Sequence, residues 1–174
     1  MLKNLSHFNN VNDYLPILTA ALIVDMIVLF RIVTGKINII SLNQWYNKFG
    51  LGAVIADVLS IVIGIILARF LYPFFFSEYS LIKFILLTCA VQITHDISFA
   101  VMFNIFPRNS SAILDVFKDY AKEVGFTILV ADAIMMISTI LLGSYLASLN
   151  TNSVIIILII SLYILPYLLY SIKR

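Results

Sequence analysis

Hydrophobic residues along this chain gather in five long runs that are separated by short polar or aromatic stretches. The runs cover residues 14–34, 50–72, 81–106, 124–149 and 154–171. The hydrocarbon core of a bilayer is about 30 Å thick, and a helix needs roughly 20 apolar residues to cross it. Each run has about that length. The pattern therefore predicts an all-α bundle of about five membrane-spanning helices that forms one domain over residues 1–174.

Aromatic and basic residues stand at the ends of these runs. The stretch after the first run holds Lys36, Trp45, Tyr46 and Lys48, and the link after the second reads YPFFFSEY over residues 72–79. Trp and Tyr are enriched where a membrane protein meets the water interface. We therefore expect both stretches to be interfacial loops.

The polar stretch before the fourth run has a helical pattern of its own. Over residues 110–123, apolar residues recur at helical spacing on one side and acidic and basic residues occupy the other. This pattern predicts a short amphipathic helix lying on the cytoplasmic surface. A solvated extension of the fourth span fits the pattern equally well.

Composition strengthens the membrane interpretation. The chain is 62% hydrophobic and 11% charged, with a mean hydropathy of +1.06, whereas soluble domains are about 45–50% apolar and about 25% charged. A soluble protein is excluded, and membrane lipids are the expected partners. The basic residues are dispersed and the net charge is only +2, so we expect no nucleic-acid partner. The single cysteine, Cys89, excludes an intramolecular disulfide.

Basic residues also suggest an orientation, because cytoplasmic loops are enriched in Lys and Arg. With five spans, one side carries eight basic residues and the other carries Lys3, Arg69 and Lys83. This bias predicts an outside N-terminus and a cytoplasmic C-terminus. Arg31 and Arg69 lie within about a turn of span ends, where a guanidinium can reach the interface, so we expect neither to be buried.

Ionisable residues inside the spans are the main functional signal. Asp25, Asp57, Asp96 and Asp132 fall within the first four spans, with His95 and Gln92 beside Asp96 in the third. A charge at mid-bilayer costs at least ~2.5–3.5 kcal/mol, so such residues usually face the interior of a bundle. At a rise of ~1.5 Å per residue, the four aspartates and His95 lie roughly 10–16 Å from the cytoplasmic ends of their spans. We expect them to share one layer.

The second and fourth spans carry their acids on stripes of small residues, which let membrane helices approach closely. These stripes are residues 53, 57, 60, 64 and 68 in the second span and residues 125, 132, 139, 143 and 147 in the fourth. Residues 46–57 also resemble residues 120–132. Both segments contain Tyr, Lys, Gly and Ala-Asp in that order, with the Asp seven residues after the Gly. The resemblance suggests a duplication in which the two spans run parallel.

Three functions fit these residues. The acids can be structural, hydrogen-bonded within the bundle and fixing its packing, as in a membrane or virion component. They can form a proton or cation path of a channel or transporter, with Asp25, Asp57, Gln92, His95, Asp96 and Asp132 as relay or binding residues. They can also serve an intramembrane metal-dependent enzyme. One spanning histidine favours the first two, so we expect no enzyme activity, resident metal or cofactor.

The fifth span carries no charge and is expected to lie at the periphery of the bundle. Tyr163, Tyr167 and Tyr170 share one of its faces, and Pro166 can kink it. Its apolar surface can face lipid or a second copy of the chain. The sequence therefore leaves open whether the protein is a homo-oligomer.

The central third of the chain resembles a set of uncharacterised small multi-pass membrane proteins of large DNA viruses that infect protists. The resemblance is carried by VQITHD (91–96), DVFKDYAKEVG (115–125) and ADAIMM (131–136). It implies a virion or an internal membrane of the host as the location. It assigns no catalytic residue, but it includes His95, Asp96 and Asp132.

Overall fold

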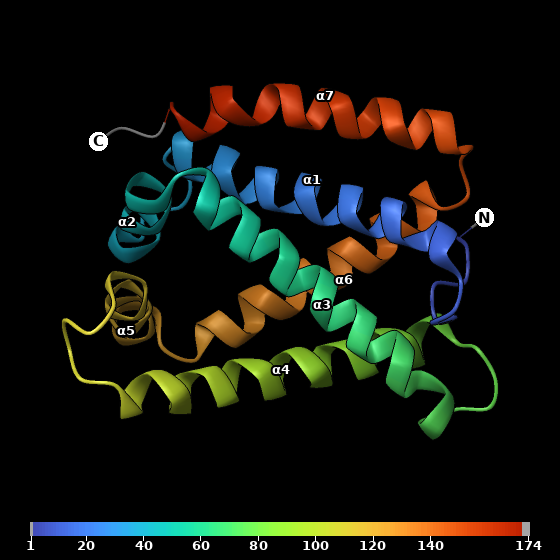
Figure 1. Cartoon of the computed structure of the whole chain (residues 1–174), viewed down its shortest axis with the longest axis horizontal. Helices are drawn as coiled ribbons and strands as arrows, with labels where there is room; N and C mark the ends of the chain where they lie inside the picture. The colour runs from blue at the N-terminus through green and yellow to red at the C-terminus, as the bar shows by residue number, and fades with distance from the viewer. Residues whose placement is uncertain (1, 172–174) are drawn as a thin grey trace.

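The computed structural model describes residues 2–171, and these residues form seven α-helices and no strand (Figure 1). A 3-10 turn, Val11–Asp13, leads into the first helix. The helices are α1 (Tyr14–Val33), α2 (Ile40–Phe49), α3 (Leu51–Phe75), α4 (Leu81–Ile105), α5 (Ala112–Val124), α6 (Thr127–Leu146) and α7 (Thr151–Leu169). Helices α1, α3, α4, α6 and α7 are long and apolar enough to cross a bilayer. The predicted all-helical bundle with five candidate spans is confirmed.

The five long helices run back and forth between two ends of the molecule (Figure 1). Helices α2 and α5 pack together at one end, here called the α2–α5 end, and the first residues of the chain lie at the other, the N-terminal end. Helix α1 packs against α3, α6 and α7, while α4 packs against α3 and α6. Fully buried apolar residues fill the centre: Ile17, Ile65, Phe84, Met136 and Ile140.

Helix α2 corrects the expectation of a loop after the first span. Ser41, Trp45 and Tyr46 are buried on one side of it, while Asn47 and Lys48 are exposed on the other. With ten residues, the helix is too short and too polar to cross a bilayer, so hydropathy does not distinguish it from a loop. The amphipathic spacing, rather than hydropathy, is the signal that predicts this helix.

A glycine ends each of the two short helices. Gly50 has φ 55° and Gly125 has φ 62°, a conformation that residues with a Cβ rarely adopt. At each glycine the chain turns into the following span, α3 or α6. Helix α5 is therefore separate from α6 instead of a straight extension of it. The two halves of the chain share one order of elements: span, short helix, glycine, span.

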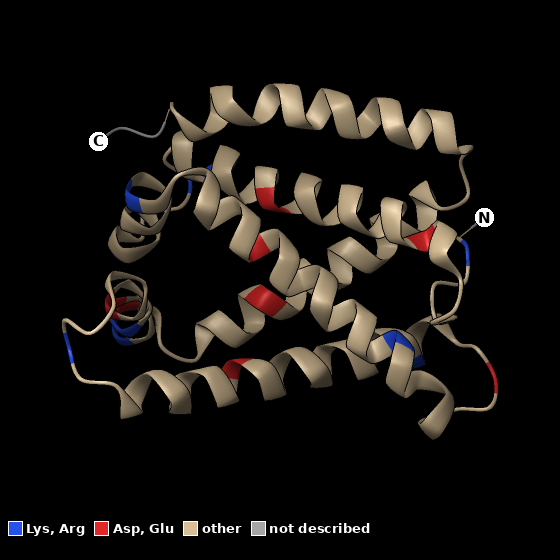
Figure 2. Ribbon diagram, viewed as in Figure 1, with Lys and Arg blue, Asp and Glu red and all other residues tan. Residues whose placement is uncertain are grey.

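Basic residues gather mainly around the α2–α5 end (Figure 2). Arg31, Lys36, Lys48 and Lys122 are all exposed there. Lys173 and Arg174, which the predicted orientation also used, lie outside the described residues. The outside location of the N-terminus stays a prediction.

Candidate functional site

Each of α1, α3, α4 and α6 carries an acidic position, drawn red, in the half of the bundle toward α2 and α5 (Figure 2). Asp25 of α1 interacts electrostatically with Asp57 of α3. Asp132 of α6 interacts with both Asp57 and Asp96 of α4. The four carboxyl groups thus follow one another in the order 96, 132, 57, 25. Together with His95 they are called the acid layer below.

Helix α2 covers one side of the acid layer. The Tyr46 hydroxyl donates to Oδ1 of Asp25 at 2.9 Å, and Trp45 Nε1 donates to Oδ2 of Asp57 at 2.9 Å. Asp25 is fully buried. Burial, reinforced by Asp25 and Asp57, raises the pKa of Tyr46 well above its usual value. The phenol therefore keeps its proton and acts as a hydrogen-bond donor to the layer.

The other side of the acid layer reaches the surface of the bundle on α4. Gln92 Nε2 donates to Oδ1 of Asp96 at 2.7 Å, and the same oxygen lies 3.1 Å from His95 Nδ1. The His95 ring stacks on Phe99, with 5.6 Å between centroids. The His95 side chain is 51% exposed and that of Asp96 is 13% exposed. The exposed fraction of the side chain is thus largest for His95 on α4, and Asp25 on α1 is fully buried.

Helix α5 brings a second tyrosine to the layer. Burial raises the pKa of Tyr120, and the carboxyl groups of Asp132, Asp57 and Asp96 raise it further. Tyr46 stands four residues before Gly50 and Tyr120 five before Gly125, and both interact electrostatically with acids of the layer. Sequence reasoning missed Trp45, Tyr46 and Tyr120 as members of the site. The Tyr-Lys-Gly-Asp repeat was the signal that could have found the two tyrosines.

The described lysine and arginine side chains do not balance the acids of the layer. Among the described residues, no Lys or Arg forms an ion pair with its four acids. Two carboxylate oxygens, Oδ2 of Asp25 and Oδ2 of Asp96, are buried and have no hydrogen-bond partner. In the described part of the chain, no three His, Cys, Asp or Glu side chains are grouped so that they could hold a metal ion.

The spans approach closely where the small-residue stripe of α3 passes the layer. A Cβ added at Gly64 would lie 2.9 Å from Met136 Cε and 3.4 Å from Gln92 Oε1. The absence of a side chain at this position lets α3 pack against α4 and α6 beside the acids. Gly143 of α6 similarly meets the backbone of α1, since its added Cβ would lie 3.6 Å from Ile17 Cα.

No family model matches this chain, and no curated protein or solved structure matches it significantly.

A second charged cluster lies at the N-terminal end, and it corrects the expectation for Arg69. The side chain of Arg69 is fully buried, not exposed at the interface. Its Nη2 donates to the carbonyl oxygens of His7 and Asn10 and lies 3.5 Å from Oδ2 of Asp13. Asp13 also accepts from Lys3 Nζ at 2.9 Å. The first residues fold back over the end of α3, so the guanidinium finds partners inside the protein.

Tyr14 and Asn10 complete this group. The Arg69 guanidinium carbon lies 4.6 Å from the centroid of the Tyr14 ring, which is within range of a cation–π contact. Asn10 Nδ2 donates to Oδ2 of Asp13 at 2.9 Å. Lys3, Asn10, Asp13 and Arg69 are called the Arg69 cluster below. No sequence signal pointed to it, because Asp13 and Lys3 lie in a polar segment without periodicity.

Proposed function

We propose that this integral membrane protein translocates protons and that the acid layer is the path along which they move. One observation carries the proposal: four carboxyl groups from four spans interact electrostatically, and no Lys or Arg among the described residues pairs with them. Buried charges are normally paired or satisfied by hydrogen bonds, because an unpaired buried charge is costly. Binding of protons reduces the repulsion between ionised carboxylates in the layer. Groups that bind and release protons in turn can form a proton relay.

The order of the groups supports a path. His95 is half-exposed on α4 and contacts Asp96. From Asp96 the electrostatic neighbours lead to Asp132, then to Asp57, and end at Asp25. Histidine is the side chain whose ordinary pKa lies nearest neutral pH, so it suits the exposed end of such a chain. Tyr46 bonds to the innermost acid and fixes its orientation.

The geometry favours protons over metal cations as the transported species. A divalent cation takes six or more oxygen ligands, or a tight set of nitrogen, sulfur and oxygen ligands. Among the described residues, no three His, Cys, Asp or Glu side chains are grouped so that they could hold a metal ion. The acids are instead spread across four helices, an arrangement that suits stepwise proton transfer.

A structural role is the second candidate, and two contacts favour it. The bonds from Tyr46 to Asp25 and from Trp45 to Asp57 join α2 to α1 and α3. If the acids only fix helix packing, their removal changes the stability of the bundle and has no effect on ion movement.

The test is proton flux in liposomes that contain the purified protein and an internal pH-sensitive dye. Wild-type protein should dissipate an imposed pH gradient, and Asp57→Asn or Asp132→Asn should abolish the flux. Asp119→Asn is the matched control, because Asp119 is a surface acid of α5 paired with Arg108 at 2.8 Å. Parallel gradients of Na⁺ and K⁺ at constant pH distinguish protons from other cations. Wild-type liposomes no leakier than empty ones would overturn the proposal.

A further inference from the structure

The first residues of the chain lie across the N-terminal end of the bundle. Lys3 N donates to the Ser144 carbonyl at 3.1 Å, and the Ser144 hydroxyl donates back to the Lys3 carbonyl. Phe8 packs edge-on against Phe70 of α3, with 5.5 Å between ring centroids. Tyr79, in the link between α3 and α4, makes a hydrogen bond with the backbone of Leu5. Residues 2–10, called the N-terminal segment below, therefore contact α3, α6 and the α3–α4 link.

Leu5 closes the centre of this end. Its side chain is 1% exposed and belongs to the same apolar cluster as Ile17 and Ile140. A Cβ added at Gly143 would lie 3.5 Å from Leu5 Cδ1, so the contact with α6 is direct. Packed apolar side chains thus separate the N-terminal end from the acid layer. Leu5 is part of this packing.

Arg69 holds the segment down. Two of its hydrogen bonds go to backbone carbonyls of the segment, at His7 and Asn10, and its ion pair goes to Asp13. Two other guanidinium nitrogens, Nε and Nη1, are buried without a partner. A buried polar network that is only partly satisfied stabilises its conformation less than a complete one does. The attachment of the segment through Arg69 is therefore only partly satisfied by hydrogen bonds.

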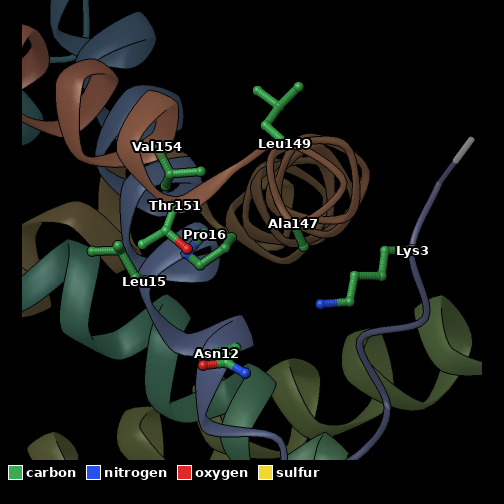
Figure 3. Close-up of a pocket in the computed structure, with 8 residues that line it drawn as sticks. All are labelled: Lys3, Asn12, Leu15, Pro16, Ala147, Leu149, Thr151 and Val154. Carbon is green, nitrogen blue, oxygen red and sulfur yellow. The ribbon is translucent and has the colours of Figure 1, made fainter.

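The segment has space beside it. A cavity of about 280 Å³ lies between the segment, the start of α1 and the α6–α7 turn (Figure 3). The Lys3 side chain extends along this cavity, with Asn12 and Thr151 also on its wall (Figure 3). Leu5 is buried against α6, whereas the Lys3 side chain is 40% exposed beside the cavity and is held there by its ion pair with Asp13. The cavity provides space next to the segment.

We infer that the N-terminal segment is a gate that closes the path between the acid layer and the N-terminal end, with Arg69 and Asp13 as its latch. The role as a gate for protons rests on the proposed function. The mechanical part, a segment that controls access to the interior of the bundle, can be measured separately.

Cysteine accessibility tests the mechanical part. Cys89 is the only cysteine, so a Cys89→Ser background allows one reporter, Thr139→Cys, to be labelled with a membrane-impermeant maleimide in liposomes. Thr139 is fully buried in α6 between Asp132 and Ser144. Labelling should be slow when the latch is intact and at least several-fold faster with Arg69→Gln or Asp13→Asn. Lys83→Gln, which removes an exposed charge near the same end, should leave the rate unchanged.

A crosslink keeps the inference testable if the latch variants do not fold. In the Cys89→Ser background, Lys3→Cys with Ser144→Cys places two thiols on residues whose backbones are hydrogen-bonded. Oxidation should lower proton flux several-fold, and reduction should restore it. Measurable proton flux that is equal in both states, or equal Thr139→Cys labelling in folded variants with and without the latch, would overturn the gate. Labelling that responds to the latch in a protein without proton flux would support the gate and refute the proton path.

Discussion

The molecule contains two buried regions of ionisable side chains that differ in how their charges are paired. In the Arg69 cluster, Arg69 and Lys3 face Asp13, so opposite charges meet and the carboxylate accepts three donors. In the acid layer, four carboxyl groups meet without a Lys or Arg partner among the described residues, and their hydrogen-bond donors include the neutral groups of Trp45, Tyr46 and Gln92, with His95 beside Asp96. The first region gains stability from its charges. In the second, ionised carboxyl groups would disfavour one another.

The two regions should therefore respond differently when one of their ionisable side chains is replaced. Breaking a buried ion pair is costly because the remaining charge is left without a partner. Neutralising one acid among several relieves repulsion instead, because like charges disfavour one another. Neutralising one charged side chain should therefore lower the stability of the protein more in the Arg69 cluster than in the acid layer. Stability measurements can expose the difference directly.

The largest loss of stability should follow Arg69→Met. The substitution leaves Asp13 with fewer donors and frees the carbonyls of His7 and Asn10, and breaking a buried pair typically costs about 3–5 kcal/mol. Both partners are fully buried, so solvent does not screen the interaction. The free energy of unfolding, from denaturant titration in detergent micelles, measures the loss. The double variant with Asp13→Asn should recover part of it, and a cost no larger than that of Lys83→Gln would contradict the latch.

A smaller loss should follow Tyr46→Phe. This variant removes the hydroxyl that donates to the buried Oδ1 of Asp25, and leaving a buried acceptor unsatisfied costs about 1–3 kcal/mol. The same denaturant titration measures it. The exposed Tyr163 of α7 supplies a matched control, since Tyr163→Phe removes a phenol that bonds only to exposed Tyr167. Equal stabilities for the two variants would show that Tyr46 does not support the acid layer.

Asp57→Asn should change stability by less than about 1 kcal/mol, near the range of ordinary surface substitutions. Asparagine has nearly the same shape and can still accept from Trp45 through its carbonyl oxygen. Loss of one negative charge from the layer offsets the slight cost. The variant should thus remain folded while proton flux disappears. A loss of stability as large as that of Arg69→Met would instead favour a structural role for the acid.

The smallest effect should appear in acid, at the contact between α2 and α5. Glu123 accepts hydrogen bonds from the Ser41 hydroxyl and from the amides of Ser41 and Ile40 at 2.5–2.8 Å. These bonds lower its pKa below the usual 4.5. The stabilisation is therefore fully present above about pH 4.5 and is lost as the pH falls through the lowered value.

Fluorescence can follow this acid step. Trp45 is the only tryptophan, and its ring lies 4.8 Å from that of Phe117 of α5. Its emission should change as Glu123 is protonated, and Glu123→Gln should remove the change. An identical acid profile in that variant would mean that another group holds α5 on α2.

Much of this architecture follows from the sequence alone. Hydropathy predicts the five long helices, because each must be apolar over the thickness of a bilayer. Helical spacing and depth brought Asp25, Asp57, Asp96 and Asp132 into one half of the bundle, as the structure has them. The rest depended on contacts between distant segments. Helix α2 is short and nearly neutral in hydropathy, so only its packing on Asp25 and Asp57 reveals its importance.

Arg69 shows most clearly where sequence reasoning fails. Its distance from the span end is compatible with a side chain that reaches the interface. Whether it does so depends on the N-terminal segment, which folds over it and supplies two carbonyl oxygens. Such backbone acceptors leave no trace in residue types. Long-range folding of a polar segment is thus the part that the sequence pattern could not predict.

The most direct test of the acid layer is proton uptake into liposomes driven by a K⁺ diffusion potential. Wild-type protein is compared with a variant that combines Asp25→Asn, Asp57→Asn, Asp96→Asn and Asp132→Asn and keeps the Arg69 cluster intact. The proposal predicts rapid uptake with wild type and none above empty liposomes with the folded variant. Equal uptake by the two proteins would show that protons do not pass through these acids.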